Sequence, residues 1–327
     1  MKRRKGKPMS DLDRAILETY RVARACSGDR FIDTAFDVLG KYVPFDSARW
    51  ATASATPAGV VFHAPHLVNE VPDWDNRYGE IRSKDTAARF MLTHPGTTGN
   101  FHSLTSLTGP DNAALLDYTR KVKHANALIT AHKDFTTGYT LTIGLFAAHV
   151  DRQYSEQERQ FVEFLYPHLM EAWAVNQSLQ IERYRSRIWS VAMCLPPGLI
   201  TLCEPAFFDL LRAEWPGGHG GHVLPPVLIE LLGSGADGHR GRHAVFRFER
   251  HPKFAFVRAR LATSVDLLTE REREVAECVA SGLTHKEVAR RMSIAPATVR
   301  NHLQAIHRRI GARNNAELVA LLQRDNL

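Results

Sequence analysis

The sequence predicts an α+β N-terminal region joined to an all-α C-terminal domain. Two observations lead to that fold class. Over roughly residues 45–149, short runs of strand-forming residues bounded by turn residues lie between helical repeats, which indicates a sheet with helices before and after it. From residue 264 onward the pattern is helical, with clear signals for where helices begin and end. A chain of 327 residues has room for two or three domains.

Two helices precede the predicted sheet, at residues 11–27 and 29–42, where apolar residues recur at helical spacing. A third helix is predicted at residues 111–123, after a loop-rich stretch. The predicted strands are Phe45–Ala53, Gly59–Ala64, Ala127–Lys133 and Tyr139–His149, with hairpin turns at Thr56–Gly59 and Thr136–Gly138.

A long helix is predicted from Ser155, whose hydroxyl forms a capping box with Glu158. Its apolar face consists of Phe161, Leu165, Leu169 and Trp173. Pro167 should kink the helix, because proline removes a backbone donor and clashes with the preceding turn. The helix can join two domains, pair with its copy in a dimer, or only cover the preceding sheet, and the sequence leaves these alternatives open.

Residues 190–262 repeat the mixture of strands and helix on a smaller scale. The predicted elements are a strand at Gly198–Leu202, a helix at Glu204–Glu214, and paired strands at Ala244–Glu249 and Phe254–Leu261. The sequence therefore predicts a second, smaller α+β segment.

Two capping boxes open the first two helices of the C-terminal domain. Thr269 is paired with Glu272, and Thr284 with Glu287, so that each hydroxyl cap has a carboxylate three residues later. Gly282 ends the first helix between them, because glycine accepts the left-handed conformation that the turn requires.

Pro296 opens a third helix that runs to about Ile310. Its inward face repeats Val299, Leu303, Ile306 and Ile310. Its outward face carries donors for base edges and phosphates: Arg300, Asn301, Gln304, Arg308 and Arg309. Between residues 284 and 313 Glu287 is the only acidic residue among many basic ones, and the whole chain has a net charge of +7. These observations predict a helix-turn-helix that binds double-stranded DNA.

The C-terminal stretch resembles the LuxR-type helix-turn-helix domain. The matching motifs are Leu268–Glu272, Gly282–Ala289 and Thr298–Leu303, and the resemblance covers roughly residues 264–327. It implies a four-helix domain that dimerises on DNA, with Arg300 and Asn301 among the base-contacting residues. The predicted DNA-binding set is Thr284, Lys286, Thr298, Arg300, Asn301, His302, Gln304, Arg308 and Arg309.

The stretch departs from the LuxR-type pattern at two positions. Ala295 replaces the serine that usually precedes the recognition helix, which removes an N-cap worth roughly 1 kcal/mol. Asn315 replaces the arginine common at the start of the last helix, where Asn314 and Glu317 offer another capping box.

The rest of the chain resembles the sensor regions of many LuxR-type regulators. Residues 10–180, with the long helix and its Tyr166–Leu169 segment, resemble a GAF-like domain, and residues 181–263 resemble a reduced PAS-like domain. Residues 1–9 form a basic tail, and residues 264–327 form the DNA-binding domain.

Trp74, Tyr78 and Asp85 resemble the residues that hold a homoserine lactone in quorum-sensing LuxR proteins. An indole N–H and a phenol can donate to carbonyl groups, and a carboxylate can accept from an amide. The spacing differs from the family's, and Thr86 stands where the family has proline. A lactone, another ligand and simple core packing therefore stay open for this trio.

Several function classes find no support in the sequence. His63 with His66, and His219 with His222, have ligand-like spacing, but each pair lies in a Pro- or Gly-rich stretch without a cysteine or carboxylate cluster, which favours solvated loop histidines. No catalytic motif, metal site or cofactor site is predicted. The four cysteines form no C-x-x-C pair, and no apolar run is long enough to span a membrane, so we expect a cytoplasmic protein.

The sequence thus predicts a transcription regulator that binds DNA as a homodimer, with an unidentified small-molecule ligand and RNA polymerase as further candidate partners. Dimerisation is expected because the last helix has more apolar residues than it needs to bury: Leu318, Val319, Leu321 and Leu322. Two alternatives are a sigma-factor-like protein, against which the predicted sheet argues, and an enzyme with a DNA-binding tail.

Overall fold

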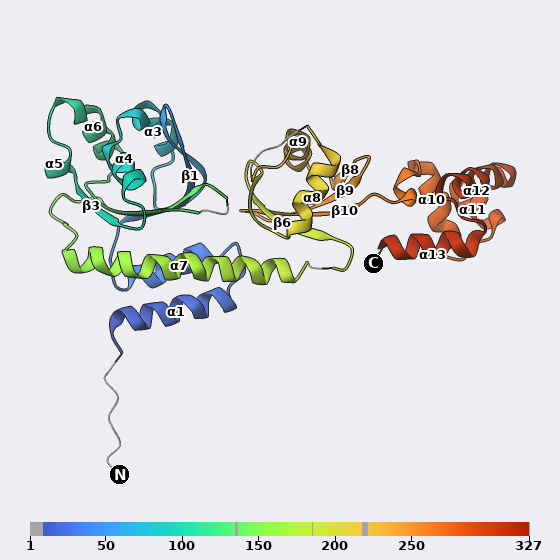
Figure 1. Cartoon of the computed structure of the whole chain (residues 1–327), viewed down its shortest axis with the longest axis horizontal. Coiled ribbons are helices and arrows are strands. Elements are labelled where there is room, and N and C mark those ends of the chain that lie inside the picture. The colour runs from blue at the N-terminus through green and yellow to red at the C-terminus, as the bar shows by residue number, and fades with distance from the viewer. Residues whose placement is uncertain (1–8, 135–136, 185, 218–221, 327) are drawn as a thin grey trace, which may run out of the picture.

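The computed structural model describes residues 9–134, 137–184, 186–217 and 222–326. Two mixed α/β parts and a helical C-terminal part follow one another along the chain (Figure 1). The predicted basic tail lies outside the described residues except for its last residue, Met9, and the predicted turn at Thr136–Gly138 lies partly outside them.

A five-stranded antiparallel sheet of order β2-β1-β5-β4-β3 organises the first part. Its strands are β1 (Ser47–Thr56), β2 (Gly59–Val68), β3 (Thr98–His102), β4 (Asn126–Lys133) and β5 (Thr140–Ala147). The four strands predicted from the sequence are confirmed with shifted ends, and β3 joins them at the edge of the sheet.

Helices cover both faces of the first sheet (Figure 1). On one face lie α1 (Asp11–Ala25), α2 (Phe31–Gly40) and α7 (Glu156–Glu182), and on the other α3 (Trp74–Ile81), η1 (Arg82–Lys84), α4 (Thr86–Thr93), α5 (Ser103–Ser106), η2 (Pro110–Asn112) and α6 (Ala113–Lys121). The main core lies under α1, α2 and α7, where Trp50, Leu128 and Leu145 from the sheet meet Leu165 and Leu169 from α7.

The expectation of a loop-rich stretch before α6 is wrong. It contains α3, α4 and β3, each of eight residues or fewer. Such short elements carry too few turns of helix or alternations of strand to stand out in a sequence. The strand β3 also depends on pairing with β4, whose residues follow it by about 30 positions.

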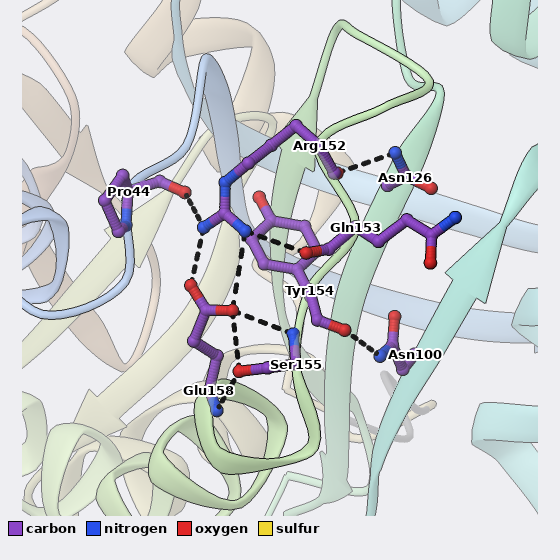
Figure 2. Close-up of polar contacts among 8 residues, drawn as sticks. All are labelled: Pro44, Asn100, Asn126, Arg152, Gln153, Tyr154, Ser155 and Glu158. Carbon is purple, nitrogen blue, oxygen red and sulfur yellow. Dashed lines mark hydrogen bonds and ion pairs between the residues drawn. The ribbon is translucent and has the colours of Figure 1, made fainter.

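The helix α7 begins at the predicted capping box, where the Ser155 N–H donates to Glu158 Oε2 at 2.8 Å. Figure 2 shows how the loop before it is fixed: Arg152 Nη2 donates to Glu158 Oε1 at 2.5 Å, and Asn126 Nδ2 donates to the Arg152 carbonyl at 2.7 Å. The helix continues through Pro167, and the kink expected there stays a prediction. Leu165, Leu169 and Trp173 are buried as predicted, so α7 covers the sheet.

The second part contains another five-stranded antiparallel sheet, of order β7-β6-β10-β9-β8. Its elements are β6 (Ser190–Leu195), β7 (Leu199–Cys203), α8 (Pro205–Glu214), α9 (Pro226–Ser234), β8 (Gly238–Arg240), β9 (Ala244–Arg250) and β10 (Ala255–Leu261). The predicted helix and strands are confirmed, whereas β6, β8 and α9 were not predicted. One face of this sheet packs with α8 and α9 through Phe207, Phe246 and Leu228.

The C-terminal part is helical. It contains the four predicted helices, α10 (Glu270–Ala280), α11 (His285–Met292), α12 (Pro296–Ile310) and α13 (Asn315–Asn326), around a core of their own apolar side chains. The short helix η3 (Ser264–Leu267), which precedes them, was not predicted. Among the described residues, no helix combines the length and apolar character needed to span a membrane.

Candidate nucleic-acid interface and ligand cavity

Local hydrogen bonds fix the geometry of the helix-turn-helix. The N–H groups of Thr269 and Thr284 donate to the carboxylates of Glu272 and Glu287 at 2.9 and 2.7 Å, and each threonine hydroxyl accepts from the backbone N–H of its glutamate. Both predicted capping boxes are therefore confirmed. Gly282 has a φ of 85°, so the residue chosen from the sequence as the helix stop does adopt the left-handed conformation.

A second residue of this motif, Ser293, is left-handed although nothing in the sequence predicts it. Ser293 ends α11 with a φ of 56° and starts the turn into α12. Non-glycine residues rarely take this conformation, because their Cβ approaches the following carbonyl oxygen. The turn between the last two helices of the motif is thus set by Ser293 and by Pro296 at the start of α12.

The recognition helix α12 has a buried face and an exposed face, as predicted. Val299, Leu303, Ile306 and Ile310 are buried in the domain core. The exposed face presents Arg300, Asn301, Gln304, Arg308 and Arg309, with Thr298 and His302 half-buried beside them. Thr284 and Lys286 are exposed at the start of α11. This arrangement leaves the predicted donors accessible from solvent while the core holds the helix in place.

Ala295 occupies the N-cap position of α12 with an extended backbone and makes no side-chain cap. The missing cap predicted from the sequence is therefore confirmed. At the start of α13, Asn314 Oδ1 accepts from the Glu317 N–H at 2.9 Å, but the Glu317 carboxylate accepts from the Arg313 N–H at 2.7 Å. The capping box predicted there forms only in its first half.

Arg309 takes part in a contact within the domain. Its Nη1 lies 2.5 Å from Glu272 Oε2 and so ties α12 to the start of α10. Burial opposes ionisation of Glu272, but hydrogen bonds from Thr269 and the charge of Arg309 hold the pKa of Glu272 below its usual value. A role for Arg309 at DNA stays a prediction, and it would compete with this ion pair.

The apolar residues of α13 are shared between the domain core and the surface. Leu318 and Leu322 are buried in the core, and Leu321 packs against it while half-buried. Val319 is also half-buried. Only part of the apolar surface expected at a dimer interface therefore remains exposed.

Two of the three candidate ligand residues in the N-terminal part are in contact. Tyr78 Oη donates to Asp85 Oδ2 at 3.1 Å, and Asp85 Oδ1 caps α4 by accepting from the Ala88 N–H at 3.0 Å. The Trp74 ring centroid lies 6.3 Å from that of Tyr78. Burial raises the pKa of Asp85, although its hydrogen bonds oppose that shift.

A buried ionic cluster lies beside this trio. Arg49 Nη2 donates to Glu70 Oε1 at 2.8 Å, and His124 Nε2 lies 3.0 Å from Glu70 Oε2. The Arg49 guanidinium carbon lies 3.7 Å from the centroid of the Trp74 ring, which is the geometry of a cation–π contact. Burial lowers the pKa of His124, so its neutral form is favoured. One signal in the sequence points to this cluster: Arg49 is the only charged residue in β1.

A cavity of about 120 Å³ is lined by Arg49, Tyr78, Asp85, Tyr118 and His124 together with several serines and threonines. The remaining lining is mainly apolar and includes Val60, Phe62, Met91, Leu107, Leu115 and Phe146. Trp74 does not line the cavity and packs against Arg49 instead. Arg49 Nε is buried without a hydrogen-bond partner among the described residues. The cavity can therefore hold a small, mostly apolar molecule that offers hydrogen-bond acceptors at this polar end.

The expectation that the histidines with ligand-like spacing lie in loops is wrong for His63 and His66. His63 and His66 lie in strand β2 rather than in a loop, and His66 Nε2 pairs with Asp33 Oδ1 at 2.5 Å. His219 lies outside the described residues. Within the described part of the chain, no three His, Cys, Asp or Glu side chains are grouped as a metal site would require.

Comparison with known proteins agrees with the geometry of the C-terminal part. Residues 266–322 match the family described as bacterial regulatory proteins, luxR family. The spore germination protein GerE of Bacillus subtilis is 39% identical over 61 residues, which are 19% of this chain and 82% of GerE. The probable transcriptional regulatory protein NarL of Mycobacterium tuberculosis is 34% identical over 71 residues, which are 22% of this chain but only 33% of NarL.

Among solved structures, Escherichia coli SdiA is 11% identical over 95% of this chain and 96% of its own, with a TM-score of 0.33. A TM-score of this size does not assign a fold to the N-terminal parts. The match to GerE extends over most of that protein, and the family match at residues 266–322 covers α10, α11 and α12. The chain belongs to the luxR family of bacterial regulatory proteins.

Proposed function

We propose that the protein is a transcription regulator that binds double-stranded DNA through α12. The exposed face of this helix carries the proposal: it presents Arg300, Asn301 and Gln304, while Val299 and Leu303 anchor the opposite face in the core. Side chains near the start of a recognition helix enter the major groove in helix-turn-helix proteins, where arginine and asparagine can bind base edges through two hydrogen bonds. No catalytic residue enters this proposal.

The proposed division of the chain into three domains follows its hydrophobic cores. We assign residues 10–180 to a GAF-like sensor domain, residues 181–263 to a PAS-like segment and residues 264–327 to the DNA-binding domain. Each has its own core, and the sheets of the first two are separate. A homodimer on inverted half-sites follows from the symmetry of most helix-turn-helix complexes, with the half-buried Val319 and Leu321 as candidates for the interface. RNA polymerase is a further candidate partner.

The sensed molecule, in this proposal, occupies the cavity beside Tyr78 and Asp85. The mainly apolar lining favours an apolar body, and the donor groups of Arg49 and Tyr118 in the same lining favour an acceptor group on the ligand. These features suit a lactone and equally other small amphiphiles. Footprinting of the region upstream of the protein's own gene, with and without cell extract, would show whether a ligand changes DNA binding.

The proposal is tested by titrating the whole chain and residues 264–327 with duplex DNA from the same region. We expect both to bind, because the C-terminal domain has its own caps, core and basic face. Affinity should fall steeply with salt, since counterions are released from each neutralised phosphate. Two chains per duplex would support the dimer. Absence of binding by both proteins at low salt would contradict the proposal.

A further inference from the structure

One face of the second sheet carries four arginines. Arg258 in β10 lies directly opposite Arg247 in β9. Two residues before Arg247 in β9 is Val245, which lies between Arg260 of β10 and Arg240 of β8. Alternate residues of a strand share a face, so all four side chains leave the same face of the sheet. The opposite face is the apolar one that packs with α8 and α9.

Trp189, just before β6, lies among these arginines. The guanidinium carbons of Arg247, Arg258 and Arg260 lie 5.4, 5.7 and 5.0 Å from the centroid of the Trp189 ring. Cation–π contacts orient the guanidinium groups but leave their charge in place. Among the described residues, neither Arg247 nor Arg258 forms an ion pair with a carboxylate, and like charges directly opposite each other in a sheet repel.

The arginine face borders a cavity of about 620 Å³ that extends to the DNA-binding domain. Arg273 of α10 adds a fifth arginine to its lining. The lining also contains three carboxylates, those of Asp237, Asp266 and Glu277. Five arginines against three carboxylates leave an excess of two positive charges. Asp266 is already bound by both terminal nitrogens of Arg260, at 2.6 and 2.9 Å.

Two arginines that line this cavity each have a buried Nε without a partner in the described part of the chain. The Nε atoms of Arg260 and Arg273 have no hydrogen-bond acceptor among the described residues, and Arg260 is only 7% exposed. Burial, and after it the charge of Arg240, lowers the pKa of Arg273. Five guanidinium groups around one cavity repel one another, and three carboxylates do not balance them, so the lining suits a bound anion.

We propose that this cavity binds the phosphate group of a small phosphorylated molecule. A phosphate monoester carries close to two negative charges at neutral pH, on the order of the excess in the lining, and offers three acceptor oxygens. Guanidinium groups bind phosphate oxygens in pairs, and the adjacent strands β8, β9 and β10 supply them side by side.

The location favours a small molecule over the backbone of bound DNA. The described lining residues come from β8, β9, β10 and their flanking segments, and from η3, α10 and α13, with none from α11 or α12. In Figure 1 the chain passes directly from β10 to the helical domain. A phosphate bound here contacts the sheet and α10 together, and therefore fixes the orientation of the DNA-binding domain relative to the second sheet.

Calorimetric titration of the whole chain with pyrophosphate, in the absence of DNA, tests this proposal. Acetate at the same ionic strength controls for general screening. We expect pyrophosphate to bind, and each of Arg247→Ala and Arg258→Ala to weaken it by about tenfold or more, because a charge-assisted hydrogen bond is lost. Arg242→Ala is the matched control: it removes an exposed arginine just after β8 that does not line the cavity, and it should leave binding unchanged.

Thermal unfolding separates this role from a structural one. If the arginines bind phosphate, Arg258→Ala should leave the Tm of the free protein unchanged or raise it, since repulsion is relieved, and should abolish the increase caused by pyrophosphate. A lowered Tm with the pyrophosphate effect intact would overturn the proposal. A lack of pyrophosphate binding at millimolar concentration would also overturn it. The same holds if the variants lose DNA affinity in phosphate-free buffer while pyrophosphate does not bind. Because the binding is measured without DNA, its outcome does not depend on the proposed function.

Discussion

The helix-turn-helix and the N-terminal cavity are built from contacts of very different range. In the helix-turn-helix, the bonds that begin α10 and α11 join residues three positions apart. In the cavity wall, Glu70 binds Arg49 across 21 positions and His124 across 54. The first region is therefore specified by short segments and can be recognised in a sequence, whereas the second exists only once the sheet has formed. The same difference determines how each region should respond to mutation.

The largest expected effect is at the cavity. Arg49→Ala should lower the free energy of unfolding by about 3–5 kcal/mol, because it leaves the Glu70 carboxylate buried without its cation. Urea unfolding of residues 10–180 measures this change. Lys121→Ala is the control, since it breaks an exposed ion pair with Asp117 and should cost no more than about 0.5 kcal/mol. Equal losses in the two variants would show that the buried cluster is no more important to the fold than a surface pair.

On the recognition helix, Arg300→Ala should cost roughly 1–3 kcal/mol of binding to the cognate site and relax sequence preference. Arg308 lies about two turns later, beside the expected path of the backbone, so Arg308→Ala should weaken all sequences alike and lower the salt slope by about one. Titration of both variants against cognate and scrambled duplexes at two salt concentrations distinguishes these outcomes. Equal loss on both duplexes for Arg300→Ala would refute its assignment as a base reader.

The smallest effect is a gain in stability at the start of α12. Ala295 already has the extended backbone of an N-cap residue, so Ala295→Ser should add the missing side-chain acceptor and stabilise residues 264–327 by about 1 kcal/mol. Ala297→Ser makes the same chemical change two residues later, outside the cap position, and serves as the control in urea unfolding. A gain of the same size from Ala297→Ser would show that capping is not the cause.

Several elements were predicted because their signals are local. The caps at Thr269 and Thr284, the stop at Gly282 and the start at Pro296 are all as expected. The long helix after Ser155 was also recognised from its capping box and its apolar face. In contrast, β3 and β8 were missed: they have five and three residues, and each lies at an edge of its sheet, where one neighbouring strand holds it in place.

The candidate sites divide in the same way. Tyr78 and Asp85 were chosen because they resemble the lactone-binding residues of quorum-sensing LuxR proteins, and they are in contact. Arg49 was missed although it lines the same cavity, because its partners Glu70 and His124 belong to distant segments. Arg309 was expected only at DNA, and its ion pair with Glu272 depends on how α12 packs against α10.

The sequence by itself determined the family, the boundaries of the C-terminal helices and the face of α12 that is free to bind, because caps, stops and helical periodicity act over a few residues. Only the tertiary structure decided which charges meet. The register of β9 against β10 places Arg247 opposite Arg258, and the folding of β1 against the rest of the first sheet buries Arg49 beside Glu70. Pairing between strands is set by contacts distant in sequence, so neither cluster can be read from the order of residues alone.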